Sequence, residues 1–321
     1  MKRTLLCIAL CGSALWAEDA SKEKDPFELS LTTSAALYPD ADHQSGSSHF
    51  SKPNGGLDGA DLAFQLDAAY TLPFLKGSDA LTEDNHLTFN MGVEVTPVSL
   101  SPVASIVFSP IAFLEFAIGG KAGSGWNVGD IFYGIAEYNP SKQDYEALDP
   151  FSSWYLNAWM SGTFQFDLAA IWEGDFHHVI ASATYKAGYQ TLTGTDETFW
   201  IWQTKHAMVE GWIYEQEYIL GYQMPFLLSM IAVGTTLSGH YQESDYGRFA
   251  SSYDGDFMTI DIWPLAEVTL NAKNRIYILA DFSSRRSFRE KYKDQEHEPL
   301  MTACGREWYF DSVAMQWIHL F

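Results

Sequence analysis

Acidic side chains recur along this 321-residue chain at positions that alternate with apolar ones. The most prominent of them are Glu94, Asp167, Glu215 and Asp281, and a cation, Arg285, follows the last. Carboxylates that share one face attract cations when water reaches that face, and they require partners when it does not. The pattern predicts either a water-filled passage that favours cations or a packed polar interior.

The same alternation assigns more charges to this face. They are Glu28, Asp67, Glu115, Glu217 and Asp261, together with Lys186 and, at a rim, Arg275. Acidic groups dominate the whole chain as well, with 41 Asp and Glu against 19 Lys and Arg. Such an excess of negative charge argues against nucleic acid as a partner.

Two other segments contain residue types that could act chemically. The stretch "GHYQESD" holds His240, Glu243 and Ser244, but on a strand Glu243 faces away from the other two. His177 and His178 also point to opposite faces, so they cannot bind one metal ion together. Because no hydrolase motif of a known family is present, we expect no enzyme activity, no metal site and no cofactor.

One basic segment stands out on this acidic chain. It reads "SSRRSFREKYK" and includes Arg286, Arg289 and Lys291. It could hold acidic lipid head groups or an anionic ligand. The alternative is an ordinary solvated loop whose charges Glu290 and Asp294 balance, as is common for charge runs.

Strands must position these residues, because the apolar positions repeat with a period of two. In "HLTFNMGVEV" one face carries Leu87, Phe89, Met91, Val93 and Val95, and the opposite face carries Glu94. Two charge-free stretches could imitate membrane helices, at 95–114 and 218–242. Pro97, Pro102 and Pro110 interrupt the first, and the second suits two strands joined near Pro225. We therefore expect an all-β fold.

The N-terminal segment, "MKRTLLCIALCGSALWA", has a basic start, a short apolar stretch and small residues at its end. These features predict a cleaved signal peptide over residues 1–17, leaving residues 18–321 as a single domain. Cys304 is then the one remaining cysteine, so the exported domain must be stable without an internal disulfide.

Long alternating runs with aromatic residues near their ends are typical of strands that cross a membrane. Only helices and closed barrels pair every backbone group inside lipid, so these strands must close into a barrel. The chain resembles bacterial outer-membrane β-barrels, and "SPIAFLEFAIGG", "FQFDLAAI" and "LGYQMP" are similar to uncharacterised spirochaete barrels. The resemblance implies that the terminal strand is read by the barrel-assembly machinery, through Val313, Met315, Trp317 and Phe321.

Twelve strands are expected, although ten or fourteen stay open. We place them at 27–38, 61–72, 86–96, 99–109, 111–121, 154–171, 177–190, 207–222, 226–242, 256–270, 275–288 and 306–321. With a periplasmic C-terminus, the short connections fall in the periplasm and the long ones outside the cell. The exceptions are 73–85 and 97–98.

The sequence thus predicts an antiparallel transmembrane β-barrel of the outer membrane, surrounded by lipid, with long extracellular loops. The expected function is a porin-like channel for small polar solutes or cations. The alternative is a structural or surface-interaction barrel without transport. The pattern predicts neither the solute, nor an oligomeric state, nor whether the loop at 122–153 folds inward to plug the bore.

Overall fold

Twelve long strands form the wall of a closed antiparallel barrel in the computed structural model, which describes residues 25–129, 132–172, 174 and 176–321. The wall strands are β1 (Phe27–Ala41), β3 (Pro53–Pro73), β4 (His86–Thr96), β5 (Ser99–Ile111), β6 (Leu114–Gly125), β9 (Tyr155–Asp167), β10 (Val179–Leu192), β13 (Gly211–Gln223), β14 (Leu228–His240), β15 (Thr259–Asn271), β16 (Asn274–Phe288) and β17 (Ala303–Leu320). The predicted signal peptide lies outside the described residues.

Each wall strand pairs with its neighbours along the chain, and the first strand pairs with the last. Thr33 of β1 lies opposite Trp317 of β17, and Leu37 lies opposite Val313. The backbone N–H of Phe321 donates to the carbonyl of Leu29 at 3.0 Å. This closure confirms the predicted barrel and the count of twelve, and β4 has the bounds that the sequence predicts.

Apolar side chains cover the outside of the wall, because one parity of each strand points outward. Val313, Met315 and Phe321 are exposed there, and Trp317 is half-buried with its Nε1 donating to Asn274. On β16 and β17 the apolar belt ends near the pair Phe282 and Phe310. In the part of the chain that the structure describes, no helix has the length and apolar character needed to cross a membrane.

The two ends of the barrel differ. At the inner end, where the C-terminus lies, the connections 112–113, 224–227 and 272–273 are short, whereas 74–85 and 168–178 are long. The second long connection was not predicted, because β9 ends at Asp167 and not at residue 171. A short 3₁₀ turn, η1 (Leu168–Ala170), also lies there. At the outer end the connections are long except for 97–98, as the sequence predicts.

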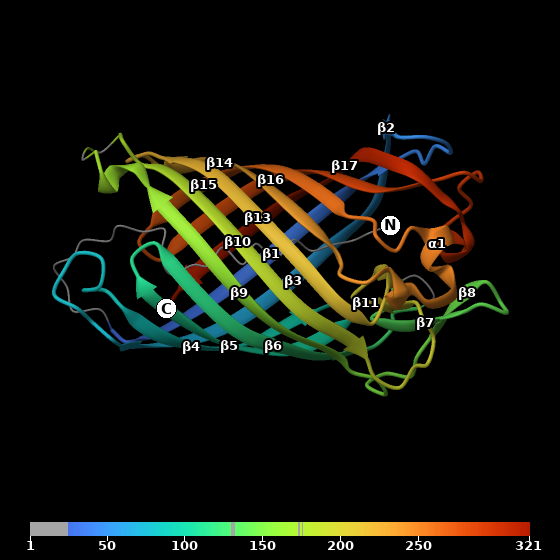
Figure 1. The fold of residues 1–321 in the computed structure, drawn as a ribbon, viewed down its shortest axis with the longest axis horizontal. Coiled ribbons are helices and arrows are strands. Elements are labelled where there is room, and N and C mark those ends of the chain that lie inside the picture. Colours follow the sequence, from blue (N-terminus) through green and yellow to red (C-terminus); the bar gives the residue numbers. More distant parts are fainter. Residues whose placement is uncertain (1–24, 130–131, 173, 175) are drawn as a thin grey trace.

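Four of the long connections pack together into what we call the outer cap: residues 126–154, 193–210, 241–258 and 289–302 (Figure 1). The cap contains β7 (Ile135–Asn139), β8 (Asp144–Ala147), β11 (Trp200–Trp202), β12 (Lys205–Met208), η2 (Glu243–Phe249), α1 (Ala250–Tyr253) and η3 (Glu298–Leu300). Its four short strands form a second sheet in the order β12-β11-β7-β8. Phe199, Tyr253 and Tyr138 lie at the centre of its core.

Candidate functional site

The inward face of the wall carries the charged residues that the sequence predicts, but their surroundings differ. Glu94 and Asp281 are 4% and 5% exposed. The side chain of Glu215 is 47% exposed, and it lies 3.7 Å from the Nζ of Lys186 across β10 and β13. Asp167 ends β9 at the inner rim, where it accepts from the Ala169 N–H and contacts His178 at 2.7 Å. Water therefore reaches the lumen wall at Glu215, whereas Glu94 and Asp281 are enclosed by protein.

Glu94 is the centre of a polar network near the outer mouth. Its Oε1 accepts from the Nζ of Lys121 at 2.7 Å and from the Nε2 of Gln203 at 2.6 Å. Gln203 also donates to Ser99 at 2.8 Å. Lys121 comes from the wall strand β6, but Gln203 belongs to the cap. The network therefore fixes part of the cap to the inner face of the wall.

Gln203 reaches Glu94 because it lies at the tip of the β11–β12 hairpin. Trp202 pairs with Lys205, so the turn has two central residues, Gln203 and Thr204, with φ of 50° and 64°. A two-residue turn with both φ positive normally uses Asn or Gly. Non-glycine residues held there cost about 1–3 kcal/mol each, and such strain concentrates at functional sites.

The hairpin is held in place on both sides. The Gln203 and Thr204 N–H groups donate to the carbonyls of Gly134 and Tyr133 at 3.0 and 2.9 Å. Trp202 stacks on Tyr155 and lies over Gly123, where an added Cβ would come within 2.6 Å of its ring. A residue larger than glycine at position 123 would therefore displace the Trp202 ring. The segment that enters the mouth is this hairpin, while the 122–153 loop supports it through pairing of β7 with β11.

The hairpin also brings a cation toward the inward carboxylates. Burial lowers the pKa of Lys205, and the negative charges of Asp261 and Glu215 oppose that shift. Lys205 therefore places an amine near the acidic side chains of the inner wall.

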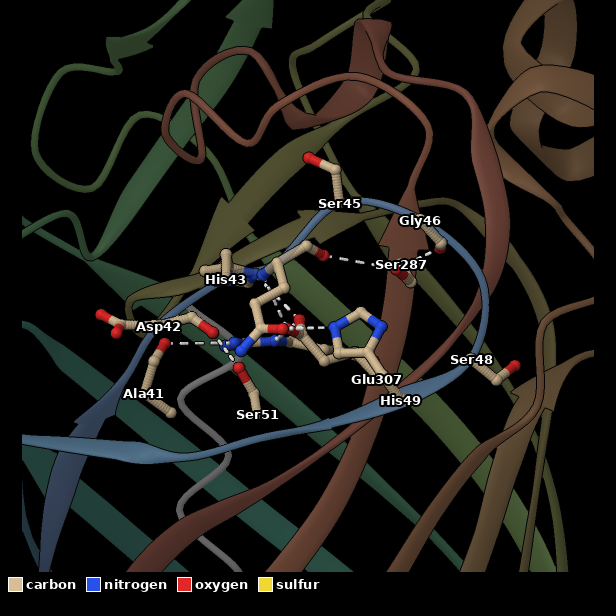
Figure 2. Close-up of polar contacts among 12 residues, drawn as sticks. Ala41, Asp42, His43, Ser45, Gly46, Ser48, His49, Ser51, Ser287 and Glu307 are labelled. Carbon is tan, nitrogen blue, oxygen red and sulfur yellow. Dashed lines mark hydrogen bonds and ion pairs between the residues drawn. The ribbon is translucent and has the colours of Figure 1, made fainter.

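A second polar cluster, centred on Glu307, lies beyond the apolar belt at the outer end (Figure 2). Glu307 is fully buried and accepts from Arg285 Nε at 2.6 Å and from the Gln44 N–H at 3.0 Å. His43 Nδ1 and His49 Nε2 contact its oxygens at 3.1 and 3.0 Å. Arg285, predicted to line the pore, thus has its charge neutralised within this cluster.

The Glu307 cluster anchors the first outer connection, which includes β2 (His49–Ser51), a short strand parallel to β17. His43 stacks on Tyr292 with ring centroids 3.6 Å apart, so the cluster also holds the 289–302 segment. Burial lowers the pKa of His43 and the charge of Arg285 adds to this, whereas the hydrogen bond to Glu307 opposes it. Sequence reasoning missed Glu307, because no spacing rule links residues 264 positions apart.

Next to this cluster is a cavity of about 310 Å³, between the inner wall and the cap. It is lined by Tyr38, Tyr292 and Tyr309, by Arg285, and by several carboxylates from β1, β3, β17 and the 289–302 segment. Arg285 packs over the ring of Tyr309 at 4.2 Å. The cavity was not predicted, since its walls come from distant parts of the chain.

The basic segment is dispersed rather than clustered. Arg285 points into the barrel, and Arg286 is buried beneath the cap, where it donates to the Asp254 carbonyl at 2.9 Å and packs on the Tyr253 ring. Lys293 lines the cavity. Arg285 thus pairs with Glu307, whereas Arg286 bonds to a backbone carbonyl and packs on an aromatic ring.

The residues weighed as hydrolase candidates have separate partners. His240 Nδ1 contacts Asp245 at 3.1 Å, and the Ser244 hydroxyl donates to Gln242 at 3.4 Å. Asp254 has φ of 59° and ends α1, so it serves turn geometry.

Part of the lumen wall is apolar. Inward residues of β13 to β16 form one cluster, with Trp263 fully buried at its centre and Met230 and Leu279 beside it. The Trp263 ring occupies the space above Gly234, and its Nε1 donates to Thr236 at 3.1 Å. The same strands also carry inward acidic residues, namely Asp261 and Glu267 on β15 and Asp281 on β16. The Trp263 cluster is therefore an apolar patch between acidic residues.

Comparisons with known proteins assign the chain to no family. Neither a family model nor a curated protein matches the chain. Among solved structures, an outer-membrane channel from Pseudomonas putida F1 is 10% identical, with a TM-score of 0.43 over 95% of this chain and 100% of that one. Outer-membrane OmpT of Vibrio cholerae is 7% identical, with a TM-score of 0.39 over 94% and 99%. A Pseudomonas aeruginosa FadL homologue is 9% identical, with a TM-score of 0.35 over 92% and 90%.

These likenesses are too distant to transfer any activity, so this chain's own features decide its class. Its sheet has no free edge in the wall, its outer face is an apolar belt, and its inner face carries charge. A surface of this kind is stable only in lipid, and closed barrels meet that condition. The protein is an outer-membrane β-barrel.

Proposed function

We propose that this barrel is a channel that passes small polar solutes or cations across the outer membrane. The observation that carries the proposal is the water-exposed pair Lys186 and Glu215 on the inner face, halfway along the wall. A charged pair remains exposed inside a barrel only where water fills part of the bore. Carboxylates outnumber cations on this face, so the proposed preference is for cations.

The β11–β12 hairpin is the proposed constriction of this channel. Gln203 at its tip binds Glu94 on the inner wall, and the packing of Trp202 over Gly123 fixes its position. Strained turns concentrate at functional sites, so the strain at Gln203 and Thr204 supports a role of this hairpin in controlling passage. Movement of the hairpin away from Glu94 would widen the mouth.

Planar-bilayer recording of the refolded protein tests the proposal. We expect single-channel steps, and a higher conductance for a Gln203→Ala/Trp202→Ala variant, which removes the hairpin's contacts with the wall. Lys142→Ala provides the matched control, because Lys142 lies at the exposed tip of the β7–β8 connection, with its side chain 65% exposed. Equal conductance of the hairpin variant and the control would exclude the hairpin as the constriction.

The second candidate is a barrel that presents its outer cap to a partner and transports nothing. The cap favours it, because a packed core that includes Phe199, Tyr246 and Tyr253 gives the loops a fixed surface. A wild-type protein that shows no current steps at any voltage would favour this function over the channel.

Other sequence-based expectations belong to the same proposal. They are the absence of enzyme activity, recognition of the terminal strand by the assembly machinery, the cleaved signal peptide, and kinship with spirochaete barrels. The exposed outward positions of Val313, Met315 and Phe321 support the second of these, since the alternating apolar face is available on β17.

A further inference from the structure

The cavity at the outer mouth has a composition that points to a class of ligand. It lies where the inner faces of β1, β16 and β17 meet the 289–302 segment of the cap. Its volume of about 310 Å³ is at the small end of the range for sites that bind small molecules. A solute that enters from outside would meet it near the constriction, so this inference deepens the channel proposal and rests on it.

The cavity has an excess of negative charge. Five carboxylates line it, and they are Asp40, Asp58, Asp294, Glu296 and Asp311. The lining cations are Lys293 and Arg285, and Glu307 already neutralises Arg285 at 2.6 Å. Burial raises the pKa of Glu296, and the charge of Asp294 adds to that rise. A cation bound between Asp294 and Glu296 would relieve their repulsion.

Aromatic rings complete the walls. Tyr38, Tyr292 and Tyr309 all line the cavity, and ring faces attract organic cations. The Tyr292 ring is fixed by its stacking on His43, which Glu307 holds. Tyr292 also packs against the core of the cap, so its ring forms a fixed part of the cavity wall.

We infer that the cavity binds a small organic cation, with carboxylates around the charge and tyrosine rings against its carbon atoms. A metal ion would not use the rings, and a neutral solute could donate hydrogen bonds to the carboxylates but would leave their negative charge uncompensated. The class is therefore an amine or quaternary ammonium compound.

Equilibrium binding of choline to the refolded barrel in neutral detergent tests the inference. The matched probe is 3,3-dimethylbutan-1-ol, which has the same shape and hydroxyl but no charge. We expect choline to bind at least ten-fold more tightly, by saturation-transfer NMR titration. Equal affinity of the two probes, or no binding of choline at millimolar concentrations, would overturn the inference.

Two variants locate the site. Asp294→Asn/Glu296→Gln should weaken choline binding at least five-fold, while Asn keeps the acceptor for the His297 N–H. Asp196→Asn/Glu197→Gln removes the same charge from a cap segment outside the cavity and should leave binding unchanged. Equal losses in both pairs would mean nonspecific attraction to an acidic surface and would refute the site.

Because binding is measured without a membrane, it is separate from the channel test. A barrel that binds choline but carries no current would contradict only the channel. A conducting barrel with no preference for choline would contradict only the cavity.

Discussion

The wall and the outer cap bury their apolar residues against different surroundings. On the wall, outward residues such as Ile278 and Met315 are 45% and 48% exposed and meet lipid. In the cap, Ile201 and Phe199 are 0% and 1% exposed and pack against other side chains. Lipid tails are as apolar as Leu, so hydrophobic burial holds the cap together but not the outer face of the wall. The wall depends instead on its closed hydrogen-bond ladder.

The sharpest way to separate the two regions is to remove the buried Glu307 charge. A Glu307→Ala variant leaves Arg285 buried without its partner, and breaking a buried ion pair costs about 3–5 kcal/mol. We expect residues 42–52 and 289–302 to exchange amide hydrogens much faster, while the strands of the lipid belt stay protected. The measurement is hydrogen exchange by mass spectrometry in detergent. Uniform loss of protection over the whole barrel would show that cap and wall unfold as one unit.

The strands of the wall could be predicted from the sequence, whereas the contacts that hold the outer connections could not. The alternation in "HLTFNMGVEV" predicts β4 and its faces, because strand parity is a local property. The contacts of Glu94 with Gln203 and of Glu307 with His43 join residues 109 and 264 positions apart. Nothing local marks them, since they depend on how irregular loops fold over the mouth. Inward carboxylates were therefore predictable, but which of them water reaches was not.

A matched pair of small truncations compares the two regions quantitatively. Ile201→Val in the cap removes one methylene from a fully buried side chain, so it should cost about 0.5–1.5 kcal/mol. Ile278→Val on the outer face should cost less than about 0.5 kcal/mol, because lipid fills the space. Local opening energies from hydrogen exchange would measure both. Equal costs would mean that the outer face of the wall is also packed against protein.

Acid should weaken the first outer connection, residues 42–52, before the wall. The folded-state pKa of His43 is lowered, so the unfolded state takes up the proton first as the pH falls below about 6.5. The stability of the first outer connection should therefore decrease from neutral pH toward pH 5. The readout is the opening energy of the Gly46 amide, which donates to Phe288 at 2.8 Å. A His43→Gln variant should lose this pH dependence, and a dependence that survives in it would assign the effect to another group.

The smallest expected effect separates the inward carboxylates from one another. Charges act on a passing ion within a Debye length of about 8 Å when water lies between them. Glu215 meets that condition, whereas Asp281 is enclosed at 5% exposure. In a potassium chloride gradient, Glu215→Gln should move the reversal potential toward zero, and Asp281→Asn should leave it nearly unchanged. Neither variant alters the lipid-facing belt, so both should insert normally.

An anion-selective wild type would refute the predicted sign. A larger shift for Asp281→Asn than for Glu215→Gln would mean that ions pass beside β16 rather than β13, along the side of the bore that the Trp263 cluster lines.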